Sequence, residues 1–404
     1  MPSALSGLKI IEFGSFISAP FCAKLMADLG AEVIKTEEPK VGDDSRRFGP
    51  FPGDIPHLEK SGLFLYMNAN KRGITVNPRT ATGLDIIKAL IADADVLIEN
   101  QQPGVMRELG LDYERLERIN PRLVMTSIST FGQTGPYKDY KGYDMTAWHG
   151  SGVGPRFAGR EKEEPLRGAW YHADHWGAIS AATATMLALA ARDLTGEGQL
   201  VDLSQVECLA THILGYQLVT LYHLTGETSS RAGDILRGGA PAGLFKTKDG
   251  FMCLLVMEDQ QWVGIKRAMG NPQWTEDPVF NVPSWQRAEV ADMMYELMDP
   301  WWKSHTNDEL FQMLQAERVP AGPLYTPKDL LHHPHLEARG FFQEVAHPKA
   351  GTVRMPGAPY RFSETPWRIQ RPAPMLGAHN KEILSGLLGF SGVDLTDMRR
   401  TGII

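Results

Sequence analysis

The 404-residue sequence has little cysteine, no long apolar run and no signal-like N-terminus. Its three cysteines, Cys22, Cys208 and Cys253, are far apart and form no CxxC pair, which disfavours a disulfide framework and a thiolate zinc site. No window approaches about eighteen uninterrupted apolar residues, so we expect no membrane-spanning segment. The first residues lack a basic stretch followed by an apolar one, which disfavours secretion. Together these absences predict a cytoplasmic protein.

Basic tracts are also absent. The formal net charge is −7, and Lys and Arg occur singly inside motifs, so we expect no nucleic-acid partner and favour a small anionic ligand. Hydrophobic residues make up 43% and charged residues 22% of the chain, which is typical of a globular protein. The length exceeds one typical core and favours two or three domains.

Neither a phosphate-binding glycine motif nor a metal motif is found. "GSGVGPRFAG" (150–159) follows a helix-like segment and opens no helix, so it is interpreted as a loop, and NAD and ATP are disfavoured. Histidines gather in two places, at His172 and His175 and at His332, His333 and His335. They show no HExxH or Cys/His spacing, and the sequence therefore predicts no metal site.

The first 130 residues alternate between strand-like and helix-like segments. Strands are predicted at 8–13, 31–35, 73–76, 94–100 and 122–129, with helices after the first strand and over 80–92, 104–109 and 113–119. Such alternation is typical of a parallel sheet covered by helices on both faces. Ligands of such sheets bind beyond the carboxyl ends of the strands.

The second half changes character. Residues 143–220 are predicted to be mostly helical, with one strand at 198–204. A hairpin at 243–256, helices near 259–269, 284–304 and 307–317, and a strand at 321–326 predict a smaller α+β domain. The last helix is predicted at "HNKEILSGLLG" (379–389).

Asp174 stands at the start of a long run of small and apolar residues, "GAISAATATMLALAA". Aspartate is among the best N-cap residues, and the local sequence favours that structural role. The same helix end is expected to hold the carboxylate ionised, and an ionised carboxylate is a usable nucleophile towards an acyl carbon. The small residues that follow would allow another backbone or a slender ligand to pack closely.

Long ordered motifs resemble those of the class III coenzyme A transferases of the CaiB/BaiF type. This family includes formyl-CoA transferase and carnitine CoA-transferase, and it shares its fold with α-methylacyl-CoA racemase. The matching blocks are "LSGLKIIEFGSFISAPFCAKLMADLGAEVIKTEEPKVGDDSRRFGP", "NANKRGITVN", "ADVLIENQQPGVMRELGL", "INPRLVMTSISTFGQTGPY", "YKGYDMTAWHGSG", "DLTGEGQLVDLSQVECL", "APAGLFKTKDG" and "ERVPAGPLYTPKDLLHHPHLEARGFF". The resemblance covers nearly the whole chain.

The resemblance implies a fold, a reaction and a set of site residues. The fold is a large Rossmann-like α/β domain (1–225), a smaller α+β domain (226–325) and a C-terminal segment (326–404) that returns to the large domain. Asp174 takes the place of the family's nucleophile, and Asp144 matches a supporting acidic residue. The positions that match CoA-binding residues are Phe16, Val76, Arg79, Asn100, Gln101, Arg107 and Lys141.

By the same resemblance, the substrates are an acyl-CoA and a carboxylic acid acceptor, and no cofactor is permanently bound. The Asp174 carboxylate would attack the thioester, release CoA thiolate and hold the acyl group as an anhydride. The family implies an interlocked homodimer, and because some relatives pair different subunits a heteromer stays open.

The sequence departs from the family pattern at several positions. Glu38 replaces a basic residue, and the order Arg107–Glu108 displaces the usual arginine, so Arg46 or Arg47 is considered as a compensating phosphate ligand. Ile17 replaces a glutamine of formyl-CoA transferase, and the glycine-rich lid is reduced to "RGGAPAG" (237–243). With Phe16 and Ile17 offering no polar group, oxalate and formate are disfavoured and a larger or more apolar acyl group is favoured.

Two other functions stay open. In the racemase branch a histidine lies in a "GHD" triad, whereas this chain has Gly142-Tyr143-Asp144, so a base would have to come from His149 or His172. An inactive CoA-binding protein is the other alternative, and the presence of Asp174 counts against it.

Overall fold

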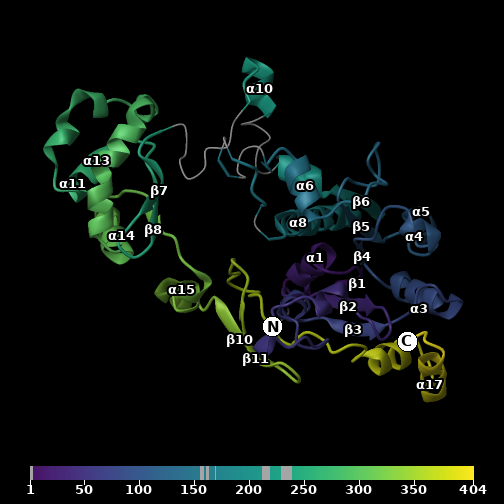
Figure 1. Cartoon of the computed structure of the whole chain (residues 1–404). Helices are drawn as coiled ribbons and strands as arrows, with labels where there is room; N and C mark the ends of the chain where they lie inside the picture. Colours follow the sequence, from purple (N-terminus) through teal and green to yellow (C-terminus); the bar gives the residue numbers. More distant parts are fainter. Residues whose placement is uncertain (1–2, 155–158, 161–162, 169, 212–218, 229–238) are drawn as a thin grey trace. The chain divides into compact units, whose positions relative to one another are not determined.

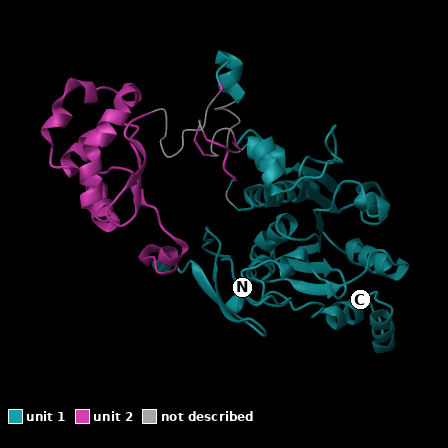
Figure 2. Cartoon of the chain, viewed as in Figure 1, with its two compact units in different colours: residues 1–153, 168–227, 337–404 teal, residues 154–167, 228–336 magenta. Residues whose placement is uncertain are grey.

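The computed structural model describes residues 3–154, 159–160, 163–168, 170–211, 219–228 and 239–404. The chain forms two compact units, which Figure 2 colours separately. Unit 1 comprises Met1–Val153, Gly168–Glu227 and Glu337–Ile404, and unit 2 comprises Gly154–Arg167 and Thr228–Leu336. The loop "GSGVGPRFAG" and the reduced lid "RGGAPAG" lie partly outside the described residues.

Unit 1 is built on a six-stranded sheet in the order β3-β2-β1-β4-β5-β6. Its strands are β1 (Lys9–Phe13), β2 (Glu32–Glu37), β3 (Arg72–Thr75), β4 (Val96–Glu99), β5 (Val124–Ser129) and β6 (Gln199–Ser204). Every neighbouring pair is parallel, which confirms the predicted Rossmann-like class. The order reverses between β1 and β4, so their following loops diverge at that point.

Long helices cover both faces of this sheet (Figure 1). They are α1 (Ser18–Ala27), α3 (Ala81–Ala92), α8 (His172–Thr195) and α17 (Gly392–Arg400). Ile10 and Val96 pack in a core with α1 and α8, whereas their neighbours Ile11 and Leu97 pack with α3 and the C-terminal segment. Successive strand residues point to opposite faces, which explains why Ile10 and Ile11 of β1 and Val96 to Ile98 of β4 are consecutive apolar residues. Among the described residues no helix has the length and apolarity needed to cross a bilayer.

Shorter elements complete unit 1. They are η1 (Asp44–Arg47), η2 (Pro52–Asp54), α2 (Gly62–Met67), α4 (Val105–Glu108), α5 (Tyr113–Leu116), α6 (Asp144–Gly150), α9 (Gln205–Leu209), α10 (Thr220–Thr225) and the antiparallel pair β10 (Phe342–His347) and β11 (Gly351–Pro356). Two of them, α6 and α9, bear on the site because they pack against α8 near its first turn.

Unit 2 contains the antiparallel sheet β7-β8-β9 and the helices that pack on it. Its elements are β7 (Ala242–Lys246), β8 (Phe251–Leu255), α11 (Asp259–Ala268), η4 (Gln273–Glu276), η5 (Pro278–Phe280), α12 (Ser284–Arg287), η6 (Ala288–Val290), α13 (Ala291–Ser304), α14 (Asn307–Ala316), β9 (Ala321–Pro323) and α15 (Pro327–Leu331), and α16 (Pro334–Ala338) follows at its end. Trp302 is 1% exposed and stacks on Phe245 at 4.8 Å between ring centroids. This core confirms the predicted smaller α+β domain.

Two predicted helices differ from the structure. The helix predicted over 284–304 is divided into α12, η6 and α13. The helix predicted over 379–389 is a π-helical turn, η7 (Lys381–Ser385), and the last helix is α17. Ser391 caps α17 by accepting a hydrogen bond from the Asp394 amide, a capping signal that the prediction missed.

Candidate active site

The loops after β1 and β4 are joined by the side chain of Asn100. Its Oδ1 accepts a hydrogen bond from the Ser15 amide at 2.9 Å, and its Nδ2 donates to the Ser15 carbonyl at 2.8 Å and to Ser18 Oγ at 2.9 Å. Gly14 allows this approach, because a Cβ there would lie 2.8 Å from Asn100 Oδ1. Asn100 therefore fixes the loop at the point where the strand order reverses.

A buried charge cluster made of Glu12, Lys35, Asp43 and Lys71 supports the same loop. Lys35 Nζ lies 2.7 Å from Glu12 and 2.6 Å from Asp43, and Lys71 Nζ lies 2.6 Å from Glu12, with all four side chains fully buried. Burial disfavours the charge on each group, but Lys35 outweighs it and holds the pKa of Asp43 below its usual range. The carboxylates likewise raise the pKa of Lys35.

This cluster reaches the loop backbone from both sides. Lys35 Nζ donates a hydrogen bond to the Gly14 carbonyl at 3.0 Å, and Asp43 Oδ1 accepts one from the Phe16 amide at 3.0 Å. Phe16 has φ 71°, a left-handed conformation that bulky residues rarely adopt. The fixed charges thus hold the strained residue in place.

The ring of Phe16 connects the loop to the start of α8. It contacts the rings of Phe48 and Tyr171 edge-on, with centroid separations of 4.9 and 5.1 Å. Tyr171 immediately precedes α8 and is also left-handed, with φ 54°. Such strain concentrates at functional sites, and here both strained residues lie in contact.

Asp174 is not the N-cap of α8, so the capping prediction is wrong. The helix begins at His172, which makes Asp174 its third residue, and Tyr171 holds the N-cap position. The carboxylate of Asp144, at the start of α6, accepts hydrogen bonds from the amides of Ala173 at 2.7 Å and Asp174 at 3.4 Å. A carboxylate thirty residues away in the sequence therefore caps the helix, and the Asp174 side chain is left for another role.

The Asp174 carboxylate accepts a hydrogen bond from Gln205 Nε2 at 2.8 Å. Burial raises its pKa to about 7; the Gln205 hydrogen bond lowers it and the Asp144 charge raises it further. The expectation that the helix end would hold this group ionised is thus wrong in direction. Desolvation outweighs the hydrogen bond from Gln205, and within the described part of the chain no cation lowers the pKa of this carboxylate.

Glu99, at the end of β4, shows that a raised pKa is not sufficient to mark a reactive group. Burial raises the pKa of Glu99 to about 7, opposed by hydrogen bonds from Ser127 and the Gln101 amide. The residue is only 1% exposed, and the Gln101 amide donates to its Oε2 at 2.6 Å. Asp174 has a pKa raised to a similar value, but the residue is only partly buried.

The structure connects some of the predicted CoA-binding residues and not others. Phe16 and Asn100 share the loop network, and Gln101 Nε2 donates to the Phe13 carbonyl at 3.2 Å. Val76 is 2% exposed and packs in the core with α3, so its side chain does not face a ligand.

The three predicted cationic ligands lie on the surface. Arg107 forms a 3.4 Å ion pair with Glu114, and both are well exposed. Arg79 lies in the exposed turn before α3, and Lys141 is exposed before α6. Within the described part of the chain, no ion pair is formed by Arg79 or Lys141. Glu38, which replaces a basic residue of the family pattern, is exposed and directly follows β2.

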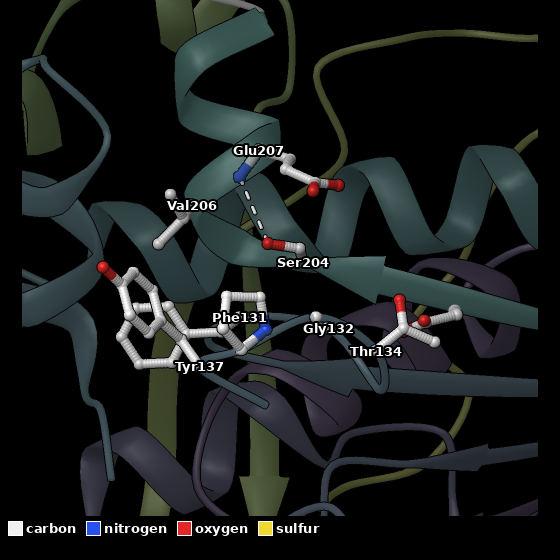
Figure 3. Close-up of a pocket in the computed structure, with 10 residues that line it drawn as sticks. Phe131, Gly132, Thr134, Tyr137, Ser204, Val206 and Glu207 are labelled. Carbon is white, nitrogen blue, oxygen red and sulfur yellow. Dashed lines mark hydrogen bonds between the residues drawn. The ribbon is translucent and has the colours of Figure 1, made fainter. Parts of the chain in front are cut away.

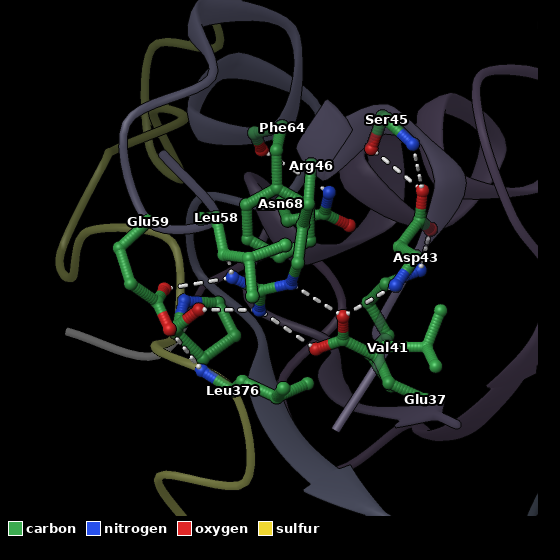
Figure 4. Close-up of polar contacts among 12 residues, drawn as sticks. Glu37, Val41, Asp43, Ser45, Arg46, Leu58, Glu59, Phe64, Asn68 and Leu376 are labelled. Carbon is green, nitrogen blue, oxygen red and sulfur yellow. Dashed lines mark hydrogen bonds and ion pairs between the residues drawn. The ribbon is translucent and has the colours of Figure 1, made fainter. Parts of the chain in front are cut away.

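Two further expectations are corrected. Arg46 is fully buried and donates to Glu37 at 2.6 Å and to Glu59 at 2.7 Å (Figure 4), so it does not serve as a phosphate ligand. Arg47 is exposed and pairs with Asp44. Ile17 is 0% exposed, and its side chain therefore cannot select an acyl group.

A cavity of about 290 Å³ lies at the carboxyl ends of β5 and β6 (Figure 3). Its walls are Phe131, Gly132, Thr134, Gly135, Pro136, Tyr137, Asp202, Ser204, Val206 and Glu207. Asp202 accepts hydrogen bonds from the Gln133 amide, and Glu207 adds a second carboxylate. Two acidic side chains make this cavity unfavourable for phosphate groups.

Of the two histidines considered as bases, His172 begins α8 and His149 lies in α6. His172 packs its ring on Trp148 at 5.0 Å, and His175 Nδ1 lies 2.7 Å from the Tyr171 carbonyl. Burial lowers the pKa of His175. Among the described residues no group of three or more His, Cys, Asp or Glu side chains is placed to hold a metal ion.

The sequence interpretation missed Gln205, Tyr171 and the buried charge cluster. Gln205 is thirty-one residues from Asp174, and no local pattern joins them. The cluster left a weak signal, because Glu12 and Lys35 are charged residues at buried positions within β1 and β2. A charged side chain that is fully buried in a strand is expected to form an ion pair with a side chain of opposite charge.

Comparison with known proteins gives matches along the whole chain. The profile of CoA-transferase family III matches residues 5–380. A succinyl-CoA–D-citramalate CoA-transferase of Chloroflexus aurantiacus is 34% identical over 406 residues, covering 100% of this chain and 98% of that protein. A formyl-CoA:oxalate CoA-transferase of Bradyrhizobium diazoefficiens is 31% identical over 424 residues, covering 100% and 98%. A solved structure of a CaiB/BaiF family protein from Brucella suis has a TM-score of 0.85 at 30% identity, covering 96% of this chain and 100% of that one.

Proposed function

The chain belongs to CoA-transferase family III, and on that premise we propose that it moves CoA from an acyl-CoA to a carboxylic acid through an acyl anhydride on Asp174. The observation that carries this assignment is the environment of Asp174. Its carboxylate is partly buried at the start of α8, accepts one amide hydrogen bond from Gln205 and has a pKa raised to about 7. A weakly solvated carboxylate of this kind is ionised at neutral pH in a large fraction of molecules and reacts more readily than a hydrated one.

The proposed reaction has four steps. In the first, one Asp174 oxygen attacks the thioester carbon, the carbon–sulfur bond breaks, and CoA leaves as thiolate. In the second, the thiolate attacks Cγ of Asp174, the anhydride bond at Cγ breaks, and the donor acid leaves as a carboxylate. In the third and fourth, the acceptor carboxylate displaces the thiolate from Cγ, and the thiolate then takes the acceptor acyl group, restoring Asp174.

An aspartate suits this sequence because an anhydride and a thioester lie close in free energy, so no step is strongly uphill. A serine or cysteine would form an ester or thioester and could not pass CoA to an acid in this way. Asp144 supports the reaction by fixing the first turn of α8 through its hydrogen bonds to the amides of Ala173 and Asp174. We therefore assign Asp144 a positioning role.

For CoA itself, we propose a binding edge beyond the carboxyl ends of β1, β3 and β4. The loop carrying Phe16, with Asn100 and Gln101, would hold the ligand through backbone and ring contacts, because the Asn100 amide is used within the protein. The exposed cations Arg79 and Lys141 would meet its phosphates, and Arg107 would do so after releasing Glu114. Val76 would contribute backbone only.

The donor and acceptor are proposed by class. The similar proteins use succinyl-CoA with a hydroxylated diacid, or formyl-CoA with oxalate, by their names. Because Ile17 is buried, the preference for an apolar acyl group loses one of its two supports. We therefore place succinyl-CoA first among donors and short dicarboxylic acids first among acceptors.

We also propose that two copies of the chain assemble. The helix α8 exposes apolar side chains, with Ile179 43%, Leu187 68% and Leu194 90% exposed. A second copy would cover such a face, as expected for an enzyme of this family. Sedimentation equilibrium of wild type and of Leu187→Glu would test this, because an added charge should dissociate the dimer.

The activity test is a matrix of acyl-CoA donors and carboxylic acids, each assayed with and without hydroxylamine. We expect CoA transfer for at least one pair and inactivation by hydroxylamine only after an acyl-CoA has been added, because hydroxylamine converts the anhydride to a hydroxamate. Asp174→Asn should show neither. Entry of solvent deuterium at the acyl α-carbon without CoA transfer would instead support the racemase.

A further inference from the structure

Gln205 is placed against the reacting carboxylate by features of two helices. It is the first residue of α9, where Ser204 Oγ accepts a hydrogen bond from the Glu207 amide and starts the helix. Its side chain is buried, at 5% exposure for the residue, and its Nε2 donates to Asp174 Oδ1. A carboxylate accepts and an amide nitrogen donates, so the orientation of the Gln205 amide is determined by its partner.

A glycine on α8 creates the space for this contact. Gly177 lies three residues after Asp174 on the same face of the helix. A Cβ at that position would lie 3.0 Å from Cγ of Gln205 and would press on the side chain. The small residue thus lets α9 approach closely enough for the amide to reach Asp174.

We propose that Gln205 is a second catalytic residue, which donates a hydrogen bond to the carbonyl oxygen of the Asp174 acyl group whenever Cγ is attacked. The proposal rests on the four-step reaction above. In steps two and three, a bond to Cγ forms, the electron pair of the Cγ–Oδ1 double bond moves onto Oδ1, and the tetrahedral species collapses by breaking the bond to the leaving group. A donor within 2.7–3.1 Å of that oxygen stabilises the developing charge, and Gln205 Nε2 lies at 2.8 Å.

The same hydrogen bond has a smaller effect in steps one and four. There Asp174 is the nucleophile or the leaving group, and the hydrogen bond only stabilises its ionised form. Substitution of Gln205 should therefore affect the rates of the four steps unequally. Acylation of Asp174 should continue, while attack on Cγ should slow, and the anhydride should accumulate.

The test compares Gln205→Met, which keeps the length of the side chain and removes the donor, with wild type. Gln315→Met is the matched control, because Gln315 in α14 donates to the Ala321 carbonyl on an exposed surface. Rapid mixing with succinyl-CoA, or with the best donor found in the matrix, followed by a hydroxylamine quench measures acylation, and steady-state transfer measures the full cycle. We expect acylation within about tenfold of wild type and turnover reduced by roughly 10²- to 10³-fold.

The pH profile supplies a second readout that a structural role would not move. The Gln205 hydrogen bond lowers the pKa of Asp174, whereas burial and the Asp144 charge raise it. Without this donor the pKa should rise, so the acidic limb of the pH profile of kcat/KM should move to higher pH in Gln205→Met. Gln205→Glu, a polar variant of the same length, should move it further because a second carboxylate would face Asp174. This variant decides the question if Gln205→Met does not fold.

Three outcomes distinguish this proposal from the one on which it rests. If the Gln205 variants show slowed turnover, preserved acylation and a shifted acidic limb of the pH profile, both the role of Gln205 and the anhydride on Asp174 are supported. Equal acylation, equal turnover and an unmoved limb in the Gln205 variants, with hydroxylamine labelling of Asp174 intact, overturn the role of Gln205 alone. No labelling of Asp174 in the wild-type enzyme that is active in transfer overturns both.

Discussion

Two aspartates near the same loop show how differently this fold treats a carboxylate. Asp43 is fully buried and lies 2.6 Å from the Lys35 ammonium, which holds its pKa below the usual range. Asp174 is partly buried and accepts a hydrogen bond from the Gln205 amide, and burial raises its pKa to about 7. The ion-paired carboxylate supports the loop, whereas the one with no cation beside it among the described residues is suited to react. The Lys35 ammonium beside Asp43 explains why burial raises the pKa of one carboxylate and not of the other.

The largest expected effect comes from Asp174→Asn. The variant keeps the shape of the side chain but cannot form an anhydride, so CoA transfer should fall by roughly 10⁴-fold or more. Transfer assays at saturating donor and acceptor measure this. Retention of more than about a hundredth of the activity would contradict covalent catalysis by this residue.

Stability measurements sharpen the comparison of the two aspartates. At pH 7, Asp43→Asn should lower the free energy of unfolding and Asp174→Asn should raise it. The depressed pKa of Asp43 means that its contribution is present above the unfolded-state value near pH 4 and lost as pH falls below it. At pH 7, Asp43→Asn should thus lower the free energy of unfolding by about 3 to 5 kcal/mol, with Lys35 left partly unpaired.

For Asp174 the folded-state pKa is raised, so its contribution is present below pH 4 and lost as pH rises through about 7. Asp174→Asn should therefore gain stability relative to wild type over this range, by about 1 to 3 kcal/mol. Urea unfolding at pH 4, 5.5 and 7 measures both variants. A loss of stability in Asp174→Asn that grows with pH would show that the carboxylate is paired after all.

The pH dependence of activity gives a smaller effect. If ionised Asp174 is the nucleophile, kcat/KM should fall about tenfold per pH unit below about 7, because the protonated form cannot attack. Initial rates from pH 5 to 8 measure the limb, with succinyl-CoA or another active donor. A rate that stays flat down to pH 5 would indicate a carboxylate with an ordinary pKa.

The smallest predicted effect concerns the exposed cations. Arg79→Ala should raise the KM for the acyl-CoA by about tenfold with little change in kcat, the scale of one charge-assisted hydrogen bond. Arg267→Ala, which removes an exposed arginine paired with Glu317 in unit 2, is the control. An unchanged KM would remove Arg79 from the binding edge.

Much of the fold followed from local sequence. Apolar runs such as Ile10–Ile11 and Val96–Ile98 predicted strands buried on both faces, and the alternation with helices predicted the parallel sheet. The carboxyl ends of these strands do carry the connected loops around Asn100. These features depend on short-range sequence patterns, which explains why they could be predicted.

The site was less predictable because its contacts join distant segments. Asp144 caps α8 across thirty residues, and Gln205 reaches Asp174 across thirty-one. The direction of the Ile17 side chain depends on how α1 packs on the sheet, and its sequence position alone suggested a ligand contact. Only the tertiary arrangement shows which carboxylate has a cation beside it.

The most direct measurement is to locate the covalent adduct. The protein would be incubated with an acyl-CoA that it accepts, without an acceptor acid, treated with hydroxylamine, digested and analysed by peptide mass mapping. The account predicts a hydroxamate on Asp174 and on no other carboxylate. A hydroxamate on Asp144 or Glu99, or transfer that proceeds without any labelled carboxylate, would contradict it.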